Sequence, residues 1–209
     1  MTDNSHHLNG RKVLVTGATG YIGSQLVPKL IEWGAVVTCT TRRPDETPHP
    51  EWPGVTWRLL DLEGDREHMR LCCEDQEVLI HLAALRGEQS RSLEEVRKIN
   101  ANGTFLLYEA AKRSQIKELF FVSTVGVTGF QKGVTEATPY AEDDSAYHQS
   151  KIEAEQYLLA QHGFEKLVII RPTIVYGEGR NDGFVFNLTR LIKTGMFLPI
   201  GRKSPLLEM

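Results

Sequence analysis

The chain has 209 residues, of which 41% are hydrophobic, and it carries a formal net charge of −3 at pH 7. This length allows one sizeable core and a small second lobe, and the near-neutral charge without a basic stripe argues against a nucleic-acid binder. No apolar run approaches the roughly 18 residues of a membrane span, and residues 1–10 lack the order of a signal peptide. We therefore expect a cytoplasmic protein that binds a small molecule and neither a membrane nor nucleic acid.

The three cysteines, Cys39, Cys72 and Cys73, are odd in number and do not have the spacing of zinc ligands. We expect reduced thiols with structural roles and no metal site. The adjacent pair Cys72-Cys73 is expected at the end of a helix.

A glycine-rich segment follows the first apolar run of the chain. Val13–Val15 predicts a strand, and residues 16–23, Thr-Gly-Ala-Thr-Gly-Tyr-Ile-Gly, open an amphipathic stretch that predicts a helix over Tyr21–Trp33. Such a loop directs backbone N–H groups and the positive end of a helix dipole at one point, where a pyrophosphate can bind. The Gly-x-x-Gly-x-x-Gly spacing is also compatible with an ordinary strand-to-helix turn. The residues that we predict to contact a dinucleotide here are Gly17, Gly20, Tyr21, Ile22 and Gly23.

Apolar runs of strand length alternate with helix-like stretches along the rest of the chain. Several runs are apolar at successive positions, which is typical of strands covered on both faces. This pattern predicts an α/β fold with a doubly wound parallel sheet. The expected strands are Val13–Val15, Val36–Thr40, Val55–Leu60, Val78–Leu82, Leu119–Val122 and Leu167–Ile170. The expected helices are Tyr21–Trp33, Arg66–Glu74, Leu93–Arg113, Ala146–His162 and Phe184–Lys193.

Two arginines follow the second predicted strand. Ligands of doubly wound sheets bind at the carboxyl ends of the strands, and an NAD-selective site usually carries Asp or Glu at this point. Here Arg42 and Arg43 are present instead, and a guanidinium suits a 2′-phosphate. The pair therefore favours NADP(H) over NAD(H) as cofactor, although two solvated arginines at a loop mouth would give the same sequence.

Small or polar residues follow the third and fourth predicted strands. We expect Asp61 and Leu62 to bracket the adenine. Ala83 and Ala84 are small enough to let the dinucleotide lie against the backbone.

Tyr147 and Lys151 lie four residues apart in a predicted helix, which puts both on one face, one turn apart. The pKa of a phenol is near ~10, and a nearby ammonium lowers it toward neutrality by favouring the phenolate. Such a pair can exchange a proton with a substrate hydroxyl or carbonyl, although two unrelated surface residues can share the spacing.

Of the histidines, we expect His81 to pack beneath the cofactor site and His148 to lie on the helix surface.

Seven motifs follow one another in order along the chain. They are the glycine loop, Asp61-Leu62, His81-Leu82-Ala83-Ala84, Asn100-Ala101-Asn102-Gly103-Thr104, Ser123-Thr124, Tyr147-x-x-x-Lys151 and Arg171-Pro172-Thr173-Ile174-Val175-Tyr176-Gly177. In this order they resemble the extended short-chain dehydrogenase/reductases, also called the NAD-dependent epimerase/dehydratase family. The resemblance covers the chain from about Arg11 to Gly201.

The resemblance implies catalytic roles for three of these residues. Tyr147 would be the acid/base, and Lys151 would lower its pKa while bonding the nicotinamide ribose. Thr124 would hold the substrate oxygen, with Ser123 as the competing candidate for that hydroxyl.

The resemblance also implies supporting residues and a domain plan. Asn100 would support the active-site helix, and Pro172 with the residues after it would line the nicotinamide pocket. A polar tail at 1–10, an NAD(P)-binding Rossmann domain at 11–176 and a partial substrate-binding lobe at 177–209 are expected, because family members continue into a lobe beyond the point where this chain stops. Family members often form homodimers, so a homodimer is expected as well.

Two activities share all of these residues. The first is an NADP(H)-preferring oxidoreductase that transfers hydride at a secondary alcohol or carbonyl, and the second is a nucleotide-sugar epimerase with tightly held NAD. A non-catalytic dinucleotide-binding protein is a third alternative, favoured by the short C-terminal part. Val125 and Gly126 follow Thr124 where dehydratases carry acidic residues, so we do not expect a 4,6-dehydratase.

Overall fold

The computed structural model describes residues 8–43, 48–64, 66–86, 92–129, 131–142, 145–161, 163–179 and 183–195. The chain divides into two compact units, Met1–Arg171 and Pro172–Met209. The first unit holds a six-stranded sheet, and the second holds the helix α6 (Phe184–Lys193).

The sheet of the first unit is parallel throughout and has the strand order β3-β2-β1-β4-β5-β6. Its strands are β1 (Lys12–Thr16), β2 (Val36–Thr41), β3 (Thr56–Leu59), β4 (Val78–His81), β5 (Glu118–Val122) and β6 (Lys166–Ile170). Each coincides with a predicted strand to within one or two residues, and the predicted doubly wound sheet is confirmed. The order reverses between β1 and β4, which is where such sheets bind ligands.

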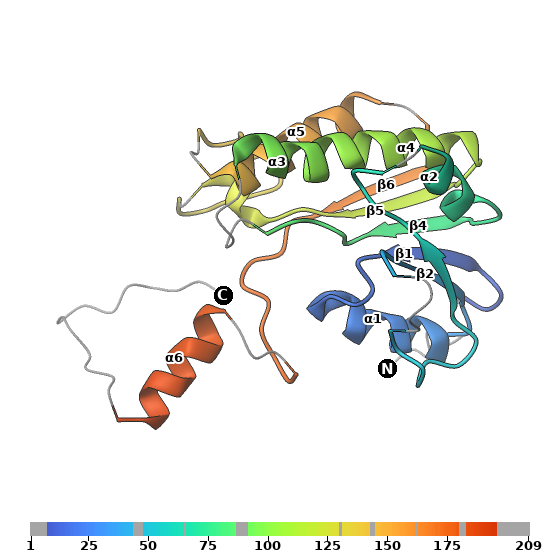
Figure 1. Ribbon diagram of the computed structural model, residues 1–209. Helices are drawn as coiled ribbons and strands as arrows, with labels where there is room; N and C mark the ends of the chain where they lie inside the picture. The colour runs from blue at the N-terminus through green and yellow to red at the C-terminus, as the bar shows by residue number, and fades with distance from the viewer. Residues whose placement is uncertain are drawn as a thin grey trace. The chain divides into compact units, whose positions relative to one another are not determined.

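Helices cover both faces of this sheet, as Figure 1 shows. α1 (Tyr21–Glu32) lies on one face, and α2 (Arg66–Cys73), α4 (Gly103–Arg113) and α5 (Ala146–Ala160) lie on the other. Successive side chains of a strand point to opposite faces. In β1, accordingly, Leu14 joins the core under α2, α4 and α5, whereas Val13 and Val15 join the core under α1.

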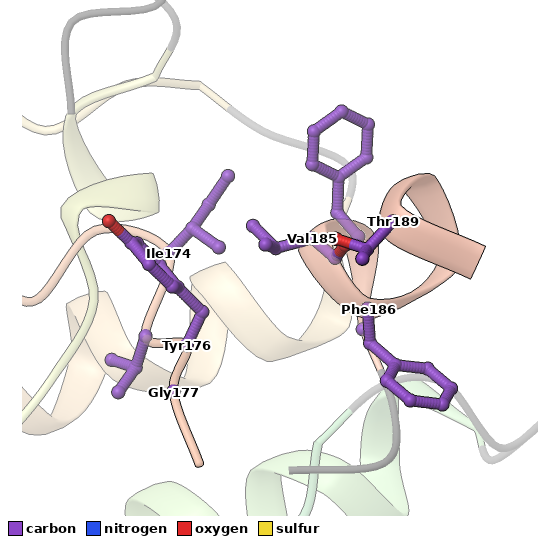
Figure 2. A pocket seen from close by; sticks show the side chains of 9 residues that line it. Ile174, Tyr176, Gly177, Val185, Phe186 and Thr189 are labelled. Atoms are coloured by element: carbon purple, nitrogen blue, oxygen red, sulfur yellow. The ribbon is translucent and has the colours of Figure 1, made fainter. Parts of the chain in front are cut away.

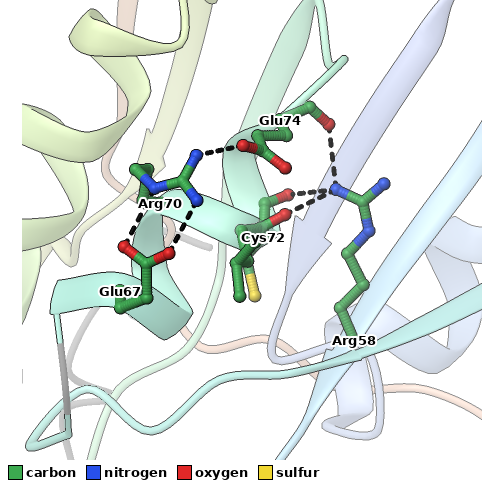
Figure 3. Close-up of polar contacts among 6 residues, drawn as sticks. Arg58, Glu67, Arg70, Cys72 and Glu74 are labelled. Carbon is green, nitrogen blue, oxygen red and sulfur yellow. Dashed lines mark hydrogen bonds and ion pairs between the residues drawn. The ribbon is translucent and has the colours of Figure 1, made fainter.

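The guanidinium of Arg58 caps the C-terminal end of α2 (Figure 3). Nη1 of Arg58, in β3, donates to the carbonyl oxygens of Leu71, Cys72 and Glu74 at 2.8, 3.0 and 2.9 Å. The last carbonyls of a helix lack intrahelical partners, so this cation satisfies them and opposes the negative end of the dipole. α2 therefore ends at Cys73, as the sequence predicted.

The predicted helix Leu93–Arg113 is interrupted in the structure. It consists of α3 (Leu93–Arg97), a π-helical segment (Lys98–Asn102) and α4. A Cβ on Gly103 would lie 2.8 Å from Cβ of Leu62 and 2.9 Å from its carbonyl oxygen, so this helix runs very close to the Leu62 backbone. Asn100 lies within the widened turn, and π-helical segments are frequent at functional sites.

All three cysteines are buried and unbonded, as expected. Burial raises the pKa of Cys39 and of Cys73 to about 12 and that of Cys72 to about 11. These thiols remain protonated and behave as apolar core groups.

The second unit contains α6 over the predicted range, Phe184–Lys193. A pocket of about 210 Å³ is lined by its first residues and by residues 174–177, among them Ile174, Tyr176 and Phe186 (Figure 2). Phe184 is 55% exposed and Tyr176 53%.

In the part of the chain that the structure describes, no helix combines the length and the apolar character needed to cross a bilayer.

Candidate active site

The loop between β1 and α1 is a tight backbone cradle. Gly17 has a φ of +71°, which favours glycine, and a Cβ there would lie 2.7 Å from the backbone nitrogen of Ala83. A Cβ on Gly23 would lie 2.5 Å from the carbonyl oxygen of Gly17. The loop therefore lies against the start of its own helix and against the chain after β4, and side chains at these positions would disrupt both contacts.

The start of α1 has the features of an anion site. Gly20 is the N-cap and supplies no side-chain cap, and the first turn contains no acidic residue. The first N–H groups of a helix have no intrahelical acceptor, and the dipole attracts negative charge to them. The bare glycine cradle and this helix end therefore fit the pyrophosphate of a dinucleotide.

Arg42 and Arg43 follow β2 and are both exposed. The backbone N–H of Arg43 donates to the Thr41 hydroxyl at 3.1 Å. Their predicted contact with a 2′-phosphate stays a prediction.

The side chain of Asp61 is exposed, whereas that of Leu62 is buried. Oδ1 of Asp61 accepts a hydrogen bond from the backbone N–H of Glu63 at 3.0 Å, and Asp61 is exposed. The side chain of Leu62 is buried in the core, so the predicted contact of Leu62 with adenine can involve only its backbone. Ala83 and Ala84 are half-buried, and the N–H of Ala83 donates to the Thr16 hydroxyl at 3.2 Å.

Tyr147 and Lys151 lie in the first two turns of α5, whose N-cap is Ser145. The Ser145 hydroxyl accepts from the backbone N–H of His148 at 3.4 Å. The Lys151 side chain is buried, and its Nζ donates to the carbonyl oxygen of Val122 at 2.8 Å. Nζ lies 6.0 Å from the ring centroid of Tyr147. The lysine thus anchors this helix turn to the end of β5.

The pKa values of this pair differ from the sequence-based expectation. Burial raises the pKa of Tyr147, and the charge of Arg86 opposes that shift. Burial lowers the pKa of Lys151 to about 7, opposed by the charge of Glu155. Without a ligand, therefore, the tyrosine is held as the neutral phenol and the lysine is close to losing its charge, because both groups are removed from water.

The two hydroxyl candidates after β5 have different surroundings. Thr124 is half-buried, and its Oγ1 accepts from the N–H of Gly126 at 3.1 Å, capping the 3₁₀ segment Val125–Thr128. Ser123 is buried, and its Oγ has no hydrogen-bond partner among the residues that the structure describes. Thr124 is therefore the more accessible of the two.

Asn100 links two segments near Tyr147. Its Oδ1 accepts from the N–H of Leu85 at 2.7 Å, and its Nδ2 donates to the Leu85 carbonyl at 2.9 Å. Nδ2 also donates to the Ser150 hydroxyl at 3.0 Å, and that hydroxyl donates to the Tyr147 carbonyl at 2.7 Å. The amide thus holds α5 and the chain after β4 together.

Two neighbours of Tyr147 were not recognised from the sequence. His148 was expected on the helix surface, but it is half-buried, and its imidazole fills the space where a Cβ of Gly126 would lie. The bare Cα of Gly126 admits the ring, a contact that the sequence did not reveal. Arg86 supplies the charge that favours the Tyr147 phenolate. The clue to His148 in the sequence is the glycine two positions after Thr124.

Pro172 belongs to the second unit, so its predicted place at the nicotinamide pocket stays a prediction.

No group of three or more histidine, cysteine or acidic residues that could hold a metal ion occurs in the described segments.

Comparisons with known proteins decide the family. The family model for the "NAD dependent epimerase/dehydratase family" matches residues 13–205. The chain belongs to this family. Its resemblance to the extended short-chain dehydrogenase/reductases, predicted from the seven motifs, is thereby confirmed.

Curated relatives and solved structures include several activities. A UDP-glucose 4-epimerase of Vibrio cholerae is 30% identical over 203 residues, covering 91% of this chain and 60% of the relative. A 3 beta-hydroxysteroid dehydrogenase/Delta 5-->4-isomerase of Mycobacterium tuberculosis is 30% identical over 213 residues, covering 94% of this chain and 56% of the relative. The structure of MoeE5 in complex with UDP-glucose and NAD is 30% identical with a TM-score of 0.69, covering 86% of this chain and 60% of that one. This epimerase/dehydratase chain thus spans 60% or less of the length of these relatives.

Proposed function

We propose that the chain is an NAD(P)-dependent oxidoreductase that acts at a secondary alcohol or carbonyl, with Tyr147 as the acid/base. The observation that carries the proposal is the 2.8 Å contact between Lys151 Nζ and the Val122 carbonyl. This contact draws the helix turn with Tyr147 to the end of β5, two residues before Thr124. The glycine cradle at the end of β1 supports binding of the dinucleotide at the same edge of the sheet.

Each side chain of the site has a task in this proposal. Tyr147 accepts the hydroxyl proton of a substrate alcohol, or returns it to a carbonyl oxygen in the reverse direction. The Thr124 hydroxyl accepts from Gly126, so its own hydrogen is available to donate to the substrate oxygen. Arg86, and Lys151 when protonated, supply the positive charge that favours the phenolate. The dinucleotide, when bound, supplies hydride exchange at the substrate carbon.

Tyr147→Phe tests the proposal. Removing the phenolic hydroxyl should lower turnover about 10²- to 10⁴-fold, because proton transfer is lost, while the Kd for NADH changes little. The assay follows NADH and NADPH absorbance with UDP-glucose and a 3β-hydroxysteroid as trial substrates. Tyr108→Phe is the matched control, because the buried Tyr108 hydroxyl has no hydrogen-bond partner within the described segments. Equal rates for wild type and Tyr147→Phe would remove this tyrosine from the mechanism.

A nucleotide-sugar epimerase is the second candidate, and its support is the 30% identity to a UDP-glucose 4-epimerase. An epimerase oxidises a sugar hydroxyl and returns the hydride to the other face, so it shows no net change in absorbance. We would extract any nucleotide retained on purification and determine its redox state. Retained, oxidised NAD favours the epimerase, and an empty protein that takes up NADPH favours the reductase. Tight binding without turnover of any substrate favours the non-catalytic alternative.

The cofactor preference is part of the proposal. The exposed guanidiniums of Arg42 and Arg43 favour NADP(H). The MoeE5 structure, by contrast, is a complex with NAD. We propose NADP(H) as the preferred cofactor and NAD(H) as the alternative.

A further inference from the structure

A chain of buried polar contacts begins beneath the glycine loop. Thr16 is the last residue of β1 and pairs in register with His81, the last residue of β4. The Thr16 hydroxyl lies 2.6 Å from Nδ1 of His81, and both residues are buried. The same hydroxyl accepts from the N–H of Ala83 at 3.2 Å. One end of this chain of contacts is therefore the strand from which the glycine loop starts.

The contacts continue from the other ring nitrogen toward α5. Nε2 of His81 lies 3.0 Å from the Thr104 hydroxyl, which donates to the Asn100 carbonyl at 2.5 Å. The Asn100 amide donates to the Ser150 hydroxyl at 3.0 Å, and the Ser150 hydroxyl donates to the Tyr147 carbonyl at 2.7 Å. All the linking side chains are buried. The path thus joins the glycine-loop strand to the backbone of Tyr147.

The hydrogen of each hydroxyl can be assigned. A threonine hydroxyl has one hydrogen, and that of Thr104 goes to the Asn100 carbonyl. Thr104 must then accept from His81, so Nε2 carries the ring proton. Nδ1 is left with its lone pair and accepts from the Thr16 hydroxyl. Burial, together with the charge of Lys151, lowers the pKa of His81 to about 3, which agrees with a neutral ring.

We propose that His81, fixed as the Nε2–H tautomer, is a positioning residue that ties the strand beneath the glycine loop to the helix of Tyr147. Its importance for hydride transfer rests on the proposed function, but its tautomer and its links do not. A hydrophobic residue could fill the volume of the imidazole. It would, however, leave the Thr16 hydroxyl without its acceptor and the Thr104 hydroxyl without its donor. A partly satisfied buried network specifies its geometry poorly.

The tautomer is tested directly by two-bond ¹H–¹⁵N correlation spectra of the uniformly ¹⁵N-labelled chain. His81→Gln identifies the signals by their loss. We expect a protonated Nε2 and an unprotonated Nδ1 that stay unchanged from about pH 5 to 8. An Nδ1–H tautomer, or a ring that titrates within this range, would overturn the inference. This measurement needs neither a cofactor nor a substrate, so it is independent of the proposed function.

The link to α5 is tested with Thr104→Val, which removes the acceptor for Nε2–H at nearly constant volume. We expect amide hydrogen-exchange protection over residues 147–151 to fall about tenfold or more. Thr38→Val is the matched control, since Thr38 is a buried β2 threonine outside this path. Thr104→Ser, which keeps the hydroxyl, should retain protection to within about threefold. Equal losses for Val and Ser, or for Thr104→Val and Thr38→Val, would show a packing role and contradict the proposal.

The last experiment tests whether the dinucleotide site is coupled to the Tyr147 turn of α5 through this path. If NADH binds as proposed, its addition should raise protection over residues 147–151 in wild type and Thr38→Val but not in Thr104→Val. The same increase in Thr104→Val would overturn the coupling. Failure of NADH to bind any variant would count against the proposed function and leave the tautomer result standing.

Discussion

The glycine loop and the Tyr147 turn of α5 lie at the same edge of the sheet but are built differently. In the loop, backbone touches backbone, and Gly17 leaves no room for a Cβ beside Ala83. In α5, buried side chains make the contacts, and Lys151 reaches across to the Val122 carbonyl. The loop therefore depends on the absence of side chains, and the Tyr147 turn depends on the hydrogen-bond partners of its side chains. Substitutions should consequently fail for different reasons in the two regions.

The largest expected effect is at the glycine loop. Gly17→Ala should abolish measurable dinucleotide binding and lower the free energy of unfolding by about 3 kcal/mol or more, because a positive φ and a backbone clash act together. Calorimetric titration with NADH and chemical denaturation measure both effects. Gly54→Ala is the matched control, with a φ of +73° and nothing within 4 Å of the added Cβ. Similar losses in both variants would show that the clash with Ala83 is unimportant.

The next largest effect concerns the buried ion pair between Glu155 of α5 and Arg171. The Glu155 carboxylate is fully buried and accepts from Arg171 Nη2 at 2.6 Å and from the Tyr140 hydroxyl at 3.0 Å. Glu155→Gln should lower the free energy of unfolding by about 3 kcal/mol, since it leaves the partly buried Arg171 without its counter-charge.

The matched control for that substitution is Glu153→Gln, two residues earlier on the same helix. Glu153 pairs with Arg97, whose side chain is 51% exposed, so its loss should cost about 1 kcal/mol or less. Urea denaturation compares the two variants. Equal costs would mean that the burial of the Glu155 pair adds nothing to stability beyond what an exposed pair gives.

A smaller effect is expected on the pH dependence of stability. In the unfolded chain Lys151 keeps its proton up to about pH 10.5, whereas the folded pKa is about 7. Between pH 7 and 9 the unfolded state binds more protons, so stability should rise with pH, by at most about 1.4 kcal/mol per pH unit. The buried thiols oppose this rise only when they ionise in the unfolded chain, near and above their ordinary pKa of 9.0.

Lys151→Met should remove this rise, and Lys98→Met, at a side chain 60% exposed, should retain it. Denaturation curves at pH 7, 8 and 9 for the three proteins provide the measurement. Parallel pH profiles for wild type and Lys151→Met would mean that the buried amine keeps its charge throughout.

The smallest effect is expected at the exposed end of β2. Arg42→Ala should weaken NADP(H) binding about tenfold and NAD(H) binding much less, since only NADP(H) offers a 2′-phosphate to the guanidinium. Arg113→Ala is the control, because the C-terminal end of α4 lies at the opposite edge of the sheet. The dissociation constants of NADP(H) and NAD(H) are measured for both variants. Equal changes for the two cofactors in Arg42→Ala would reject a contact between Arg42 and the 2′-phosphate.

The contrast between the two regions also explains what the sequence could predict. Strands and the glycine loop are encoded locally, in apolar runs and in glycines that steric contact requires, so β1, α1 and the sheet class were predictable. The π-helical turn at Asn100 was not, because it accompanies a close approach of Gly103 to Leu62 from another part of the chain. The place of His148 and the pKa of Tyr147 depend on burial, which a spacing of residues does not reveal.

We expect a dinucleotide to bind in the first unit, from the start of α1 to the Tyr147 turn of α5. A crystal structure of the chain grown with NADH tests this directly. We predict the pyrophosphate at the start of α1 and the nicotinamide ribose within hydrogen-bonding distance of Tyr147 and Lys151. A dinucleotide bound elsewhere, or one whose nicotinamide end points away from α5, would contradict the account.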